Sequence, residues 1–589
     1  MGGKLNPPEQ ETSLERTRGT GRAFGSPLLL IIAAGIALQV VTLFRPINQP
    51  DWREADMGGI ARNFAREGMN PLFPRVDWRG DGPGFVEMEF PFLSWTMAVF
   101  YRAFGSGEIA GRVFTFLISL ATLAIFVRLA GDSLGRLGVL AATAFYLSSP
   151  LVSELSTKLQ PEMWMMLGYV AAIRHFLMWT EHGRVRDYLI ALAATSFAIL
   201  AKATAAHVGL LFLLIVLARW GVRALRDLRL WGFALASLLP ATIWYVHAHR
   251  LWLNYGNSLG LSDEAHWFSF DLLGRPLYFL GILRQEVFHV WMPAGVLLIV
   301  LVLAYFRPFK RMQLLVLWGT SLVAYYVLTV RSAAHDPLYY YHVVSVPVAA
   351  IAFGLAVELI AALKPDRERP SRMAVVSGFA ALVMGLMGVL GLSRRVLVAG
   401  TGLLTIAVGL VSALVFGLNS KVDQSVALKA RFRSIVSALS VTLASMTLLT
   451  GVGLSVHRQL TCLRPHALMA CAREFAVATA PGDLILVSGG TCLHPAGGRA
   501  AYNTSYFLYW MNRKGFTICL QRQTVEQVET FRLQGARFFV AEKQKLAGQA
   551  GFEQELRKRY TVVAECPEAT MFSLRENGHL PASPDRGRL

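Results

Sequence analysis

Charged side chains are scarce in this sequence. Only 16% of the 589 residues are Asp, Glu, Lys or Arg, and 54% are hydrophobic. Soluble domains carry about 25% charged residues. Apolar runs near the roughly 20 residues that cross a bilayer as a helix recur from residue 26 to residue 456. The composition therefore excludes an ordinary soluble protein and predicts a polytopic α-helical membrane protein. The net charge of +19 comes mostly from basic residues in short loops, so we expect no nucleic-acid partner.

Signatures of two other protein classes are also missing. The sequence has no glycine-rich phosphate loop, because the pairs Gly489-Gly490 and Gly497-Gly498 lack the spacing and context of a nucleotide-binding motif. An enzyme that binds a nucleotide is therefore not expected. The sequence also has no internal repeat, whereas inverted repeats are typical of secondary transporters.

The loops between the apolar runs set the expected topology. Basic residues cluster in alternate loops, which should therefore face the cytoplasm. An odd number of spans, about thirteen, places everything after about residue 457 outside. The predicted spans are 26–44, 108–127, 137–152, 161–179, 187–201, 204–218, 231–249, 287–306, 313–330, 340–362, 374–392, 396–417 and 434–456.

Four regions follow from this pattern. Residues 1–25 should be a disordered cytoplasmic tail, and residues 26–456 the transmembrane domain, whose first outer loop spans 45–107. Residues 457–577 should form an extracytoplasmic domain, and residues 578–589 a second disordered tail. We place the protein in a bacterial inner membrane as a multi-pass protein.

The C-terminal region has the pattern of an α/β domain. Strands are expected at 483–488, 536–541, 561–564 and 571–574, with a helix at 525–533. All five cysteines lie in the C-terminal region. An extracytoplasmic compartment permits one or two disulfides with one thiol left over, and buried free cysteines are the alternative.

The stretch DWREADMGGIARNF, residues 51–64, follows the first apolar run. Met57, Ile60, Ala61 and Phe64 share one face at helical spacing, which predicts a helix. In the simplest interpretation it lies on the membrane surface, with Asp51 as its cap and Glu54 as the partner in a capping box. Asp56 has no such local explanation, and Gly58 and Gly59 beside it would let another group approach the backbone.

The rest of the outer loop has a recognisable order of motifs. It contains Glu87-Met-Glu-Phe-Pro-Phe-Leu-Ser-Trp95 and Phe104-Gly105, and the next span opens with Glu108-Ile-Ala-Gly-Arg112. This order resembles the large membrane glycosyltransferases of the GT-C fold. The similar families are the protein O-mannosyltransferases, the aminoarabinose transferases of lipid A and the rhizobial lipopolysaccharide glycosyltransferase-like branch. The resemblance covers about residues 1–360 by motif and the whole chain by architecture.

Two positions depart from the family pattern. Relatives have an Asp-Glu pair where this chain has Arg53-Glu54, although a bacterial branch with W-R-x-A-D matches Trp52 to Asp56. The catalytic carboxylate is therefore Asp56, our first choice, or Glu54. Many relatives have Lys-Pro-Pro-Leu where this chain has Phe90-Pro-Phe-Leu93, so another cation must replace the phosphate-binding lysine.

The resemblance implies transfer of a sugar from a polyprenyl-phosphate donor to a glycan, lipid or protein acceptor of the cell envelope. A carboxylate would act as general base, cations would stabilise the leaving phosphate, and the configuration of the sugar would invert. We expect Lys202, Arg331 and His335 to bind the donor phosphate, because each lies at an outer helix end.

Further candidates share this outer position. A simpler explanation for each is that the side chain extends to the membrane–water interface. Ionisable groups in membrane segments are, however, more often functional. These candidates are Arg53, Glu89, Arg112, Lys158 and Tyr340, and Glu162 lies beside Lys158. We expect no metal cofactor, because the spacing of His247, His249, His266 and His289 matches no ligand signature; a divalent ion is the alternative.

The main alternative function is a flippase or transporter of lipid-linked sugars. A transporter should have inverted repeats, broken helices and charges near the bilayer midplane. In this sequence the charges gather at the outer ends of the spans and the largest loops lie outside. We therefore prefer the enzyme.

Overall fold

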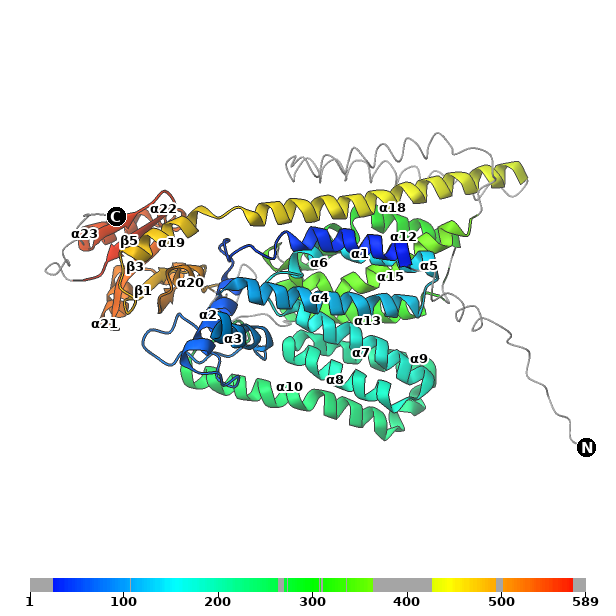
Figure 1. The fold of residues 1–589 in the computed structure, drawn as a ribbon, viewed down its shortest axis with the longest axis horizontal. Helices are drawn as coiled ribbons and strands as arrows, with labels where there is room; N and C mark the ends of the chain where they lie inside the picture. Colours follow the sequence, from blue (N-terminus) through cyan, green and yellow to red (C-terminus); the bar gives the residue numbers. More distant parts are fainter. Residues whose placement is uncertain are drawn as a thin grey trace, which may run out of the picture.

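The computed structural model describes residues 25–575 except 106, 263–269, 273, 307, 309–310, 335, 364–425, 494–499 and 501. A bundle of apolar helices forms one end of the molecule and a small domain with a sheet forms the other, with α2 and α3 between them (Figure 1). The bundle helices are α1 (Gly25–Val40), α4 (Glu108–Gly131), α5 (Arg136–Ser148), α6 (Pro150–Leu155), α7 (Glu162–His182), α8 (Val185–Ala201), α9 (Val208–Trp220), α10 (Leu228–Tyr255), α11 (Pro276–Gln285), α12 (Pro293–Phe306), α13 (Gln313–Leu328), α14 (Val330–Ala333), α15 (Val346–Ala361) and α18 (Val426–Leu463).

Every predicted span within the described residues coincides with helical structure, while 374–392 and 396–417 lie outside them. Within the described part, 5 helices are long and apolar enough to cross a membrane, or up to 6 if a bent pair counts as one span. Several other apolar helices are shorter than this measure requires. The helical membrane architecture is therefore confirmed, and the number of about thirteen spans remains a prediction.

The predicted span 287–306 is not one straight helix. A π-helix over Glu286–Trp291 ends at Met292, and α12 begins at Pro293 after a bend of 90°. Proline disfavours the helical conformation in the residue before it, and Met292 has a positive φ of 57°. The predicted span 287–306 therefore stays a prediction, with its helix broken at Met292.

The outer loop contributes two helices, α2 (Trp52–Glu67) and α3 (Phe92–Phe104). The predicted helix in the DWREADMGGIARNF stretch is confirmed, and the Asp51 side chain caps it by accepting hydrogen bonds from the backbone N–H groups of Arg53 and Glu54. Residues Arg53 to Phe64 of α2 are all buried. This helix therefore lies inside the protein, and the expectation that it lies on the membrane surface was wrong.

The C-terminal domain has a five-stranded sheet with the order β2-β1-β3-β5-β4. β1 pairs in parallel with β2 and β3, whereas β5 is antiparallel to β3 and β4. Its elements are α19 (Ala467–Val477), β1 (Leu484–Ser488), α20 (Tyr506–Met511), β2 (Gly515–Ile518), α21 (Val525–Leu533), β3 (Ala536–Glu542), α22 (Lys543–Ala547), α23 (Ala550–Arg559), β4 (Thr561–Glu565) and β5 (Ala569–Ser573). All four predicted strands and the predicted helix are present, and β2 was missed.

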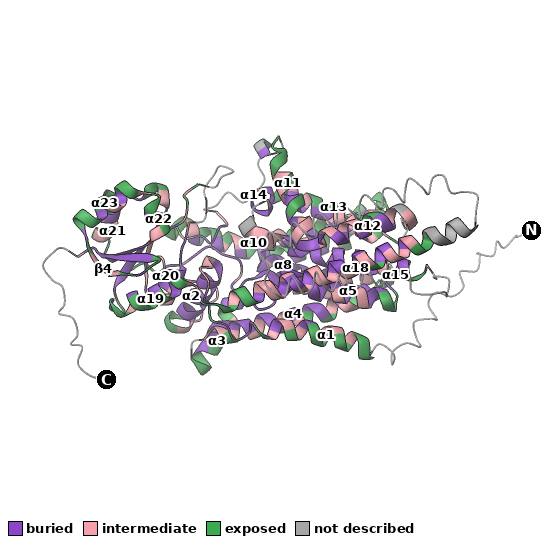
Figure 2. Cartoon of the chain, turned by 90° about the horizontal axis from the view of Figure 1, so that it is seen from above, coloured by how far each residue is buried: buried purple, intermediate pink, exposed green. Residues whose placement is uncertain are grey.

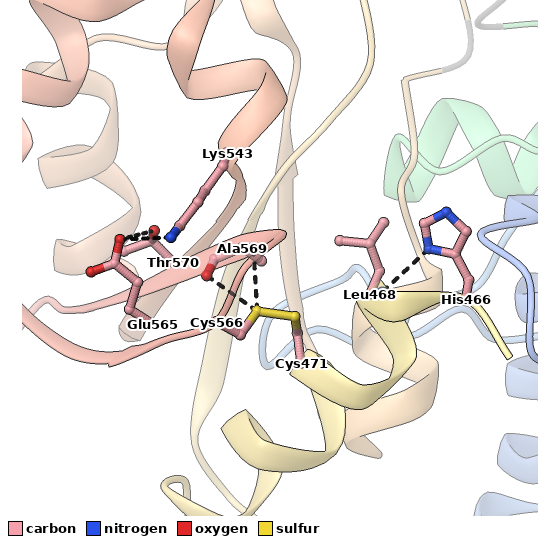
Figure 3. The surroundings of a disulfide bond; sticks show 8 residues. All are labelled: His466, Leu468, Cys471, Lys543, Glu565, Cys566, Ala569 and Thr570. Atoms are coloured by element: carbon pink, nitrogen blue, oxygen red, sulfur yellow. Dashed lines mark hydrogen bonds and ion pairs between the residues drawn. A yellow bond between two sulfur atoms is a disulfide. The ribbon is translucent and has the colours of Figure 1, made fainter.

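Two disulfides cross-link this domain. Cys471 on α19 is bonded to Cys566 beside β5, as Figure 3 shows, and Cys492 is bonded to Cys519. Cys462 is the free cysteine. Of the two alternatives left open by the sequence, the structure has the disulfides with one remaining thiol.

The outer loop fastens the C-terminal domain to the bundle. The Gly80 N–H donates to the Gly515 carbonyl at 2.7 Å, and the Gly515 N–H donates to the Asp77 carbonyl at 2.9 Å. The Asn48 amide donates to the Cys462 carbonyl at 2.7 Å. Buried residues run from the bundle through α2 into the sheet (Figure 2), so the loop forms a continuous packed layer between the two.

Candidate functional site

A polar cavity lies at the N-terminal end of α2, and we call it the α2 cavity. Its walls come from α2, the end of the outer loop, the start of α7, the segment after α8 and the loops around residues 259–261 and 329–341. The ionisable and phenolic side chains that line it are Arg53, Glu89, Glu162, Lys202, Tyr340 and Tyr341. Four of the candidates predicted from the sequence are thus brought together in one place.

Arg53 and Glu89 form one buried ion pair of this cavity. The Arg53 Nη2 lies 2.5 Å from the Glu89 Oε2, and the Arg53 Nη1 donates to the Leu259 carbonyl at 3.3 Å. Burial alone would raise the pKa of Glu89, but the charges of Arg53 and Lys202 outweigh it and lower that pKa. A guanidinium has five N–H donors, so Arg53 retains donors for a ligand.

Lys202 and Glu162 form the second buried pair. Lys202 follows α8 and its Nζ lies 2.5 Å from the Glu162 Oε1. The same ammonium lies over the rings of Tyr340 and Tyr341, at 4.8 and 4.4 Å from their centroids. The other oxygen, Glu162 Oε2, is buried and has no hydrogen-bond partner among the residues that the structure describes. A buried acceptor without a donor is costly, so a ligand hydroxyl that donated to it would satisfy it.

Glu54 is held in a separate cluster. Its carboxylate lies 2.9 Å from the Arg112 Nη1 and 3.4 Å from the Arg45 Nη2, and it accepts from the Leu159 N–H at 3.0 Å. Burial acts to raise the pKa of Glu54, but the charges of Arg112 and Arg45 outweigh it and hold that pKa well below its usual range. The expected capping role of Glu54 was therefore wrong: its oxygens face Arg112, not the start of α2.

Asp56 lies apart from the residues that line the α2 cavity. Its Oδ1 accepts a hydrogen bond from the Trp78 Nε1 at 3.1 Å, and Oδ2 is buried with no partner among the described residues. Burial raises the pKa of Asp56 to about 7, although the hydrogen bond from Trp78 acts in the opposite direction. One turn earlier in α2, the Trp52 carbonyl accepts a hydrogen bond from the Ser505 hydroxyl of the C-terminal region, so Asp56 lies near the contact of α2 with that domain.

The remaining candidates are distributed around the cavity. Arg112 is fully buried against Glu54 and the carbonyls of Arg45 and Thr157. Lys158 pairs with Asp51 at 2.9 Å and with Glu154 at 3.2 Å, which ties the cap of α2 to α6. These contacts make Arg112 and Lys158 supports of the outer loop, without a place in the cavity wall.

Of the three predicted phosphate ligands, Lys202 lines the cavity and Arg331 does not. Arg331 is on α14, whose neighbours Thr329 and Ser332 line the cavity, but Arg331 itself does not. His335 lies outside the described residues. Tyr341 was missed by the sequence interpretation, although the Tyr339-Tyr-Tyr run that pointed to Tyr340 contains it. Within the described ranges, no three His, Cys, Asp or Glu side chains are grouped to hold a metal.

Part of the chain matches a known protein family. Residues 83–244 match the family model described as dolichyl-phosphate-mannose-protein mannosyltransferase. That segment contains Glu89, Glu162 and Lys202 of the cavity. No curated protein matches the sequence.

The fold is similar to that of ArnT from Cupriavidus metallidurans. The apo structure of that protein matches with a TM-score of 0.58 and 16% identity, covering 93% of this chain and 97% of ArnT. Its structure bound to undecaprenyl phosphate matches with a TM-score of 0.58 and 17% identity, covering 93% and 98%. The chain therefore shares the fold of ArnT, and its residues 83–244 match the mannosyltransferase family model.

Proposed function

We propose that the protein transfers a sugar from a polyprenyl-phosphate donor to an acceptor of the cell envelope, a glycan, lipid or protein, at the outer face of the membrane. The observation that carries this proposal is the α2 cavity, in which Arg53 and Lys202 lie with two carboxylates and two tyrosines. ArnT, whose fold this chain shares, has been crystallised with undecaprenyl phosphate. A lipid phosphate is the ligand that this cavity fits best.

The donor phosphate would bind between Arg53 and Lys202. Each cation already has a carboxylate partner, Glu89 or Glu162, but each keeps N–H donors that those carboxylates do not use. Charge-assisted hydrogen bonds to phosphate are stronger than neutral ones. Lys202 thereby supplies the cation that the family lysine, replaced here by Phe90, cannot supply.

The general base would be a carboxylate of this cavity. We propose Glu162, because within the described part of the chain its Oε2 has no hydrogen-bond donor, so it can accept the proton of an acceptor hydroxyl. Asp56, the choice from the sequence, remains the competing prediction. Substitutions can distinguish the two candidate bases, because Glu162 lines the cavity whereas Asp56 contacts Trp78 outside the cavity wall.

The reaction would then be a single displacement. The acceptor oxygen attacks the anomeric carbon and forms the new glycosidic bond, while its proton passes to the carboxylate. The bond from that carbon to the phosphate oxygen breaks, and both electrons stay on the lipid phosphate. Arg53 and Lys202 stabilise this charge. Attack from the face opposite the phosphate inverts the configuration of the sugar.

The orientation is part of the proposal. The two disulfides favour an oxidising compartment for the C-terminal domain, and the basic loops favour the cytoplasm for the opposite side. This would place the α2 cavity, next to that domain, at the outer face of a bacterial inner membrane. Reporter fusions at Arg229 and at Asp483 test it, since they should report cytoplasm and outside, respectively.

The decisive experiment follows the bond to the sugar. Proteoliposomes that contain the purified protein would receive polyprenyl-phosphate sugar labelled in the sugar, together with an envelope extract as acceptor. We expect label in the acceptor and free polyprenyl phosphate in equal amount. A flippase would move intact labelled lipid to the other leaflet without releasing polyprenyl phosphate, and that outcome would replace the enzyme by the transporter.

A further inference from the structure

A second polar cleft lies on the other side of α2. It opens between the C-terminal half of α2, the junction of α3 with α4, and helices α19 and α20 of the C-terminal domain. It shares none of its lining residues with the α2 cavity. Six of its lining side chains carry the argument, and we call it the arginine cleft: Arg62, Arg66, Tyr101, Glu108, Arg473 and Tyr509.

The charges of this cleft are unbalanced. Arg62 is neutralised by Asp77 at 2.8 Å and also donates to the Tyr509 carbonyl at 3.1 Å. Arg66 donates to a neutral acceptor, the Asn512 Oδ1, at 2.9 Å, and to no carboxylate in the described ranges. Arg473 is exposed on α19 and makes no hydrogen bond or ion pair with the described residues. Two guanidinium groups therefore face one cleft without a carboxylate partner of their own.

The one carboxylate in the wall does not offset them. Glu108, the first residue of α4, accepts a hydrogen bond from the Tyr509 hydroxyl at 2.7 Å. This bond fastens the C-terminal domain to the bundle at the edge of the cleft. An anion that entered would meet Arg66 and Arg473 first, and charge-assisted hydrogen bonds to guanidinium groups are strong and geometrically specific.

The shape of the cleft is built into the packing. A side chain at Gly58 would place its Cβ only 2.8 Å from the Tyr509 ring, so glycine there lets α20 approach α2. Asn512 ends α20 in the left-handed conformation, with φ of 52°, and its side chain accepts from Arg66. The aromatic rings of Tyr101, Tyr509 and Trp510 form the rest of the wall. The cleft is thus a feature of the folded interface between loop and domain.

We propose that the arginine cleft holds an anionic group, a phosphate or a carboxylate, of the glycan or glycolipid acceptor. This inference rests on the proposed transfer reaction. α2 lies between the two sites, with Arg53 in the cavity and Arg62 and Arg66 in the cleft. At 1.5 Å per residue these cleft arginines are about 13 and about 20 Å along the helix from Arg53. The acceptor is therefore an anionic saccharide larger than one sugar unit.

Binding to the purified full-length protein tests this directly, without any transfer reaction. The two probes are tetragalacturonate and an N-acetylglucosamine disaccharide bisphosphate, and their controls are the methyl-esterified and the dephosphorylated forms, both of which are neutral. We expect at least one charged probe to bind with a Kd at least tenfold lower than its neutral form, and the probe that does so identifies a carboxylate or a phosphate. The double variant R66Q/R473Q should weaken that binding about tenfold or more, since it removes two charged hydrogen-bond donors.

Matched measurements separate this inference from the proposed reaction. R522Q removes an exposed arginine of the same domain outside the cleft, and it should leave the Kd unchanged. Undecaprenyl phosphate should bind the double variant as it binds the wild type. Equal affinity for charged and neutral probes, or equal affinity of wild type and double variant, would overturn the cleft assignment. Failure of transfer with intact probe binding would overturn the reaction alone.

Discussion

The Glu54 carboxylate lies 2.9 Å from the guanidinium of Arg112, a residue 58 positions further along the chain. Both side chains are buried, at 1% and 0% exposure. Arg112 also donates to the carbonyls of Arg45, Pro46 and Thr157. This pair therefore joins α2 to α4 and to the segments before α2 and after α6, and it fixes the helix that borders the α2 cavity.

Replacing Glu54 by Gln should destabilise the protein. The change leaves Arg112 buried without its counter-charge, and breaking a buried ion pair in this way costs about 3–5 kcal/mol. A capping role alone would have cost about 1 kcal/mol. Thermal unfolding of the detergent-purified variant measures the difference. Glu555→Gln, at an exposed site on α23, is the control that should leave stability unchanged. A loss as small as that of a cap would contradict the importance of the cluster.

Because of Asp56, the free energy of unfolding should fall as pH rises from about 4 to about 7. Its pKa rises from 3.8 in the unfolded chain to about 7 in the folded protein because of burial. Between these values the folded state binds a proton that the unfolded state does not, so stability falls as pH rises from about 4 to about 7. Above about 7 this contribution is constant.

The variant Asp56→Asn tests that direction, because Asn does not titrate. Melting temperatures of wild type and variant, measured at pH 5 and pH 8, give the difference due to this carboxyl group. We expect the wild type to lose more stability between the two pH values than the variant, by an amount on the order of 1–3 kcal/mol. Parallel pH profiles would show that Asp56 is ionised in the folded protein.

The two disulfides should differ in their contribution. Cys471 and Cys566 are 95 residues apart and Cys492 and Cys519 are 27 apart, which by loop entropy corresponds to about 4.7 and about 3.6 kcal/mol. The pair C471S/C566S should therefore lower the unfolding free energy of the domain by about 1 kcal/mol more than C492S/C519S. Peptide mapping without reductant should first find these two pairings. A Cys462 disulfide in that map would contradict the structure.

Local features were predictable from the sequence. The Asp51 cap and the helix after it follow from contacts within four residues, and the bend at Met292 could have been read from Pro293. β2, which has four residues, was missed. Its first residue, Gly515, is needed where the strands meet, since a Cβ there would lie 1.8 Å from the Ile485 carbonyl oxygen.

The sequence predicted several residues of the site, but it did not predict which of them form ion pairs with each other. Ionisable groups at outer helix ends pointed to Arg53, Glu89 and Lys202, because such groups are costly near lipid without a function. The partners of the buried charges come from distant positions. Glu162 is 40 residues from Lys202. Glu54 pairs with Arg112 and therefore does not cap α2. One sequence contains no signal for such long-range pairs.

Lys202→Ala should weaken binding of the donor lipid. Lys202 lines the α2 cavity, and losing a charged hydrogen bond to phosphate costs about 1.5–3 kcal/mol, which is tenfold or more in Kd. Arg331→Ala should have a smaller effect, because Arg331 does not line the cavity. Titration with undecaprenyl phosphate measures both. A larger effect at Arg331 would restore the assignment made from the sequence.

The general base can be identified by two substitutions that preserve shape. Glu162→Gln keeps an oxygen for the Lys202 hydrogen bond but cannot take a proton, and general-base catalysis is worth about 10²–10⁴-fold. We therefore expect Glu162→Gln to lose at least about 100-fold in turnover with donor affinity within about threefold of wild type. Asp56→Asn should retain turnover within about tenfold, because Asp56 lies outside the cavity wall.

Single-turnover transfer with saturating donor measures this step, and size-exclusion profiles of both variants control for folding. If Asp56→Asn is inactive and Glu162→Gln active, the base is Asp56, and α2 must then shift when substrate binds so that Asp56 reaches the cavity. If both variants stay active, Glu89 is the remaining carboxylate of the cavity wall, and Glu89→Gln should then be inactive. A fully active set of all three variants would exclude carboxylate catalysis in the α2 cavity, since Arg53, Lys202 and the tyrosines beside them have no group that accepts a proton at neutral pH.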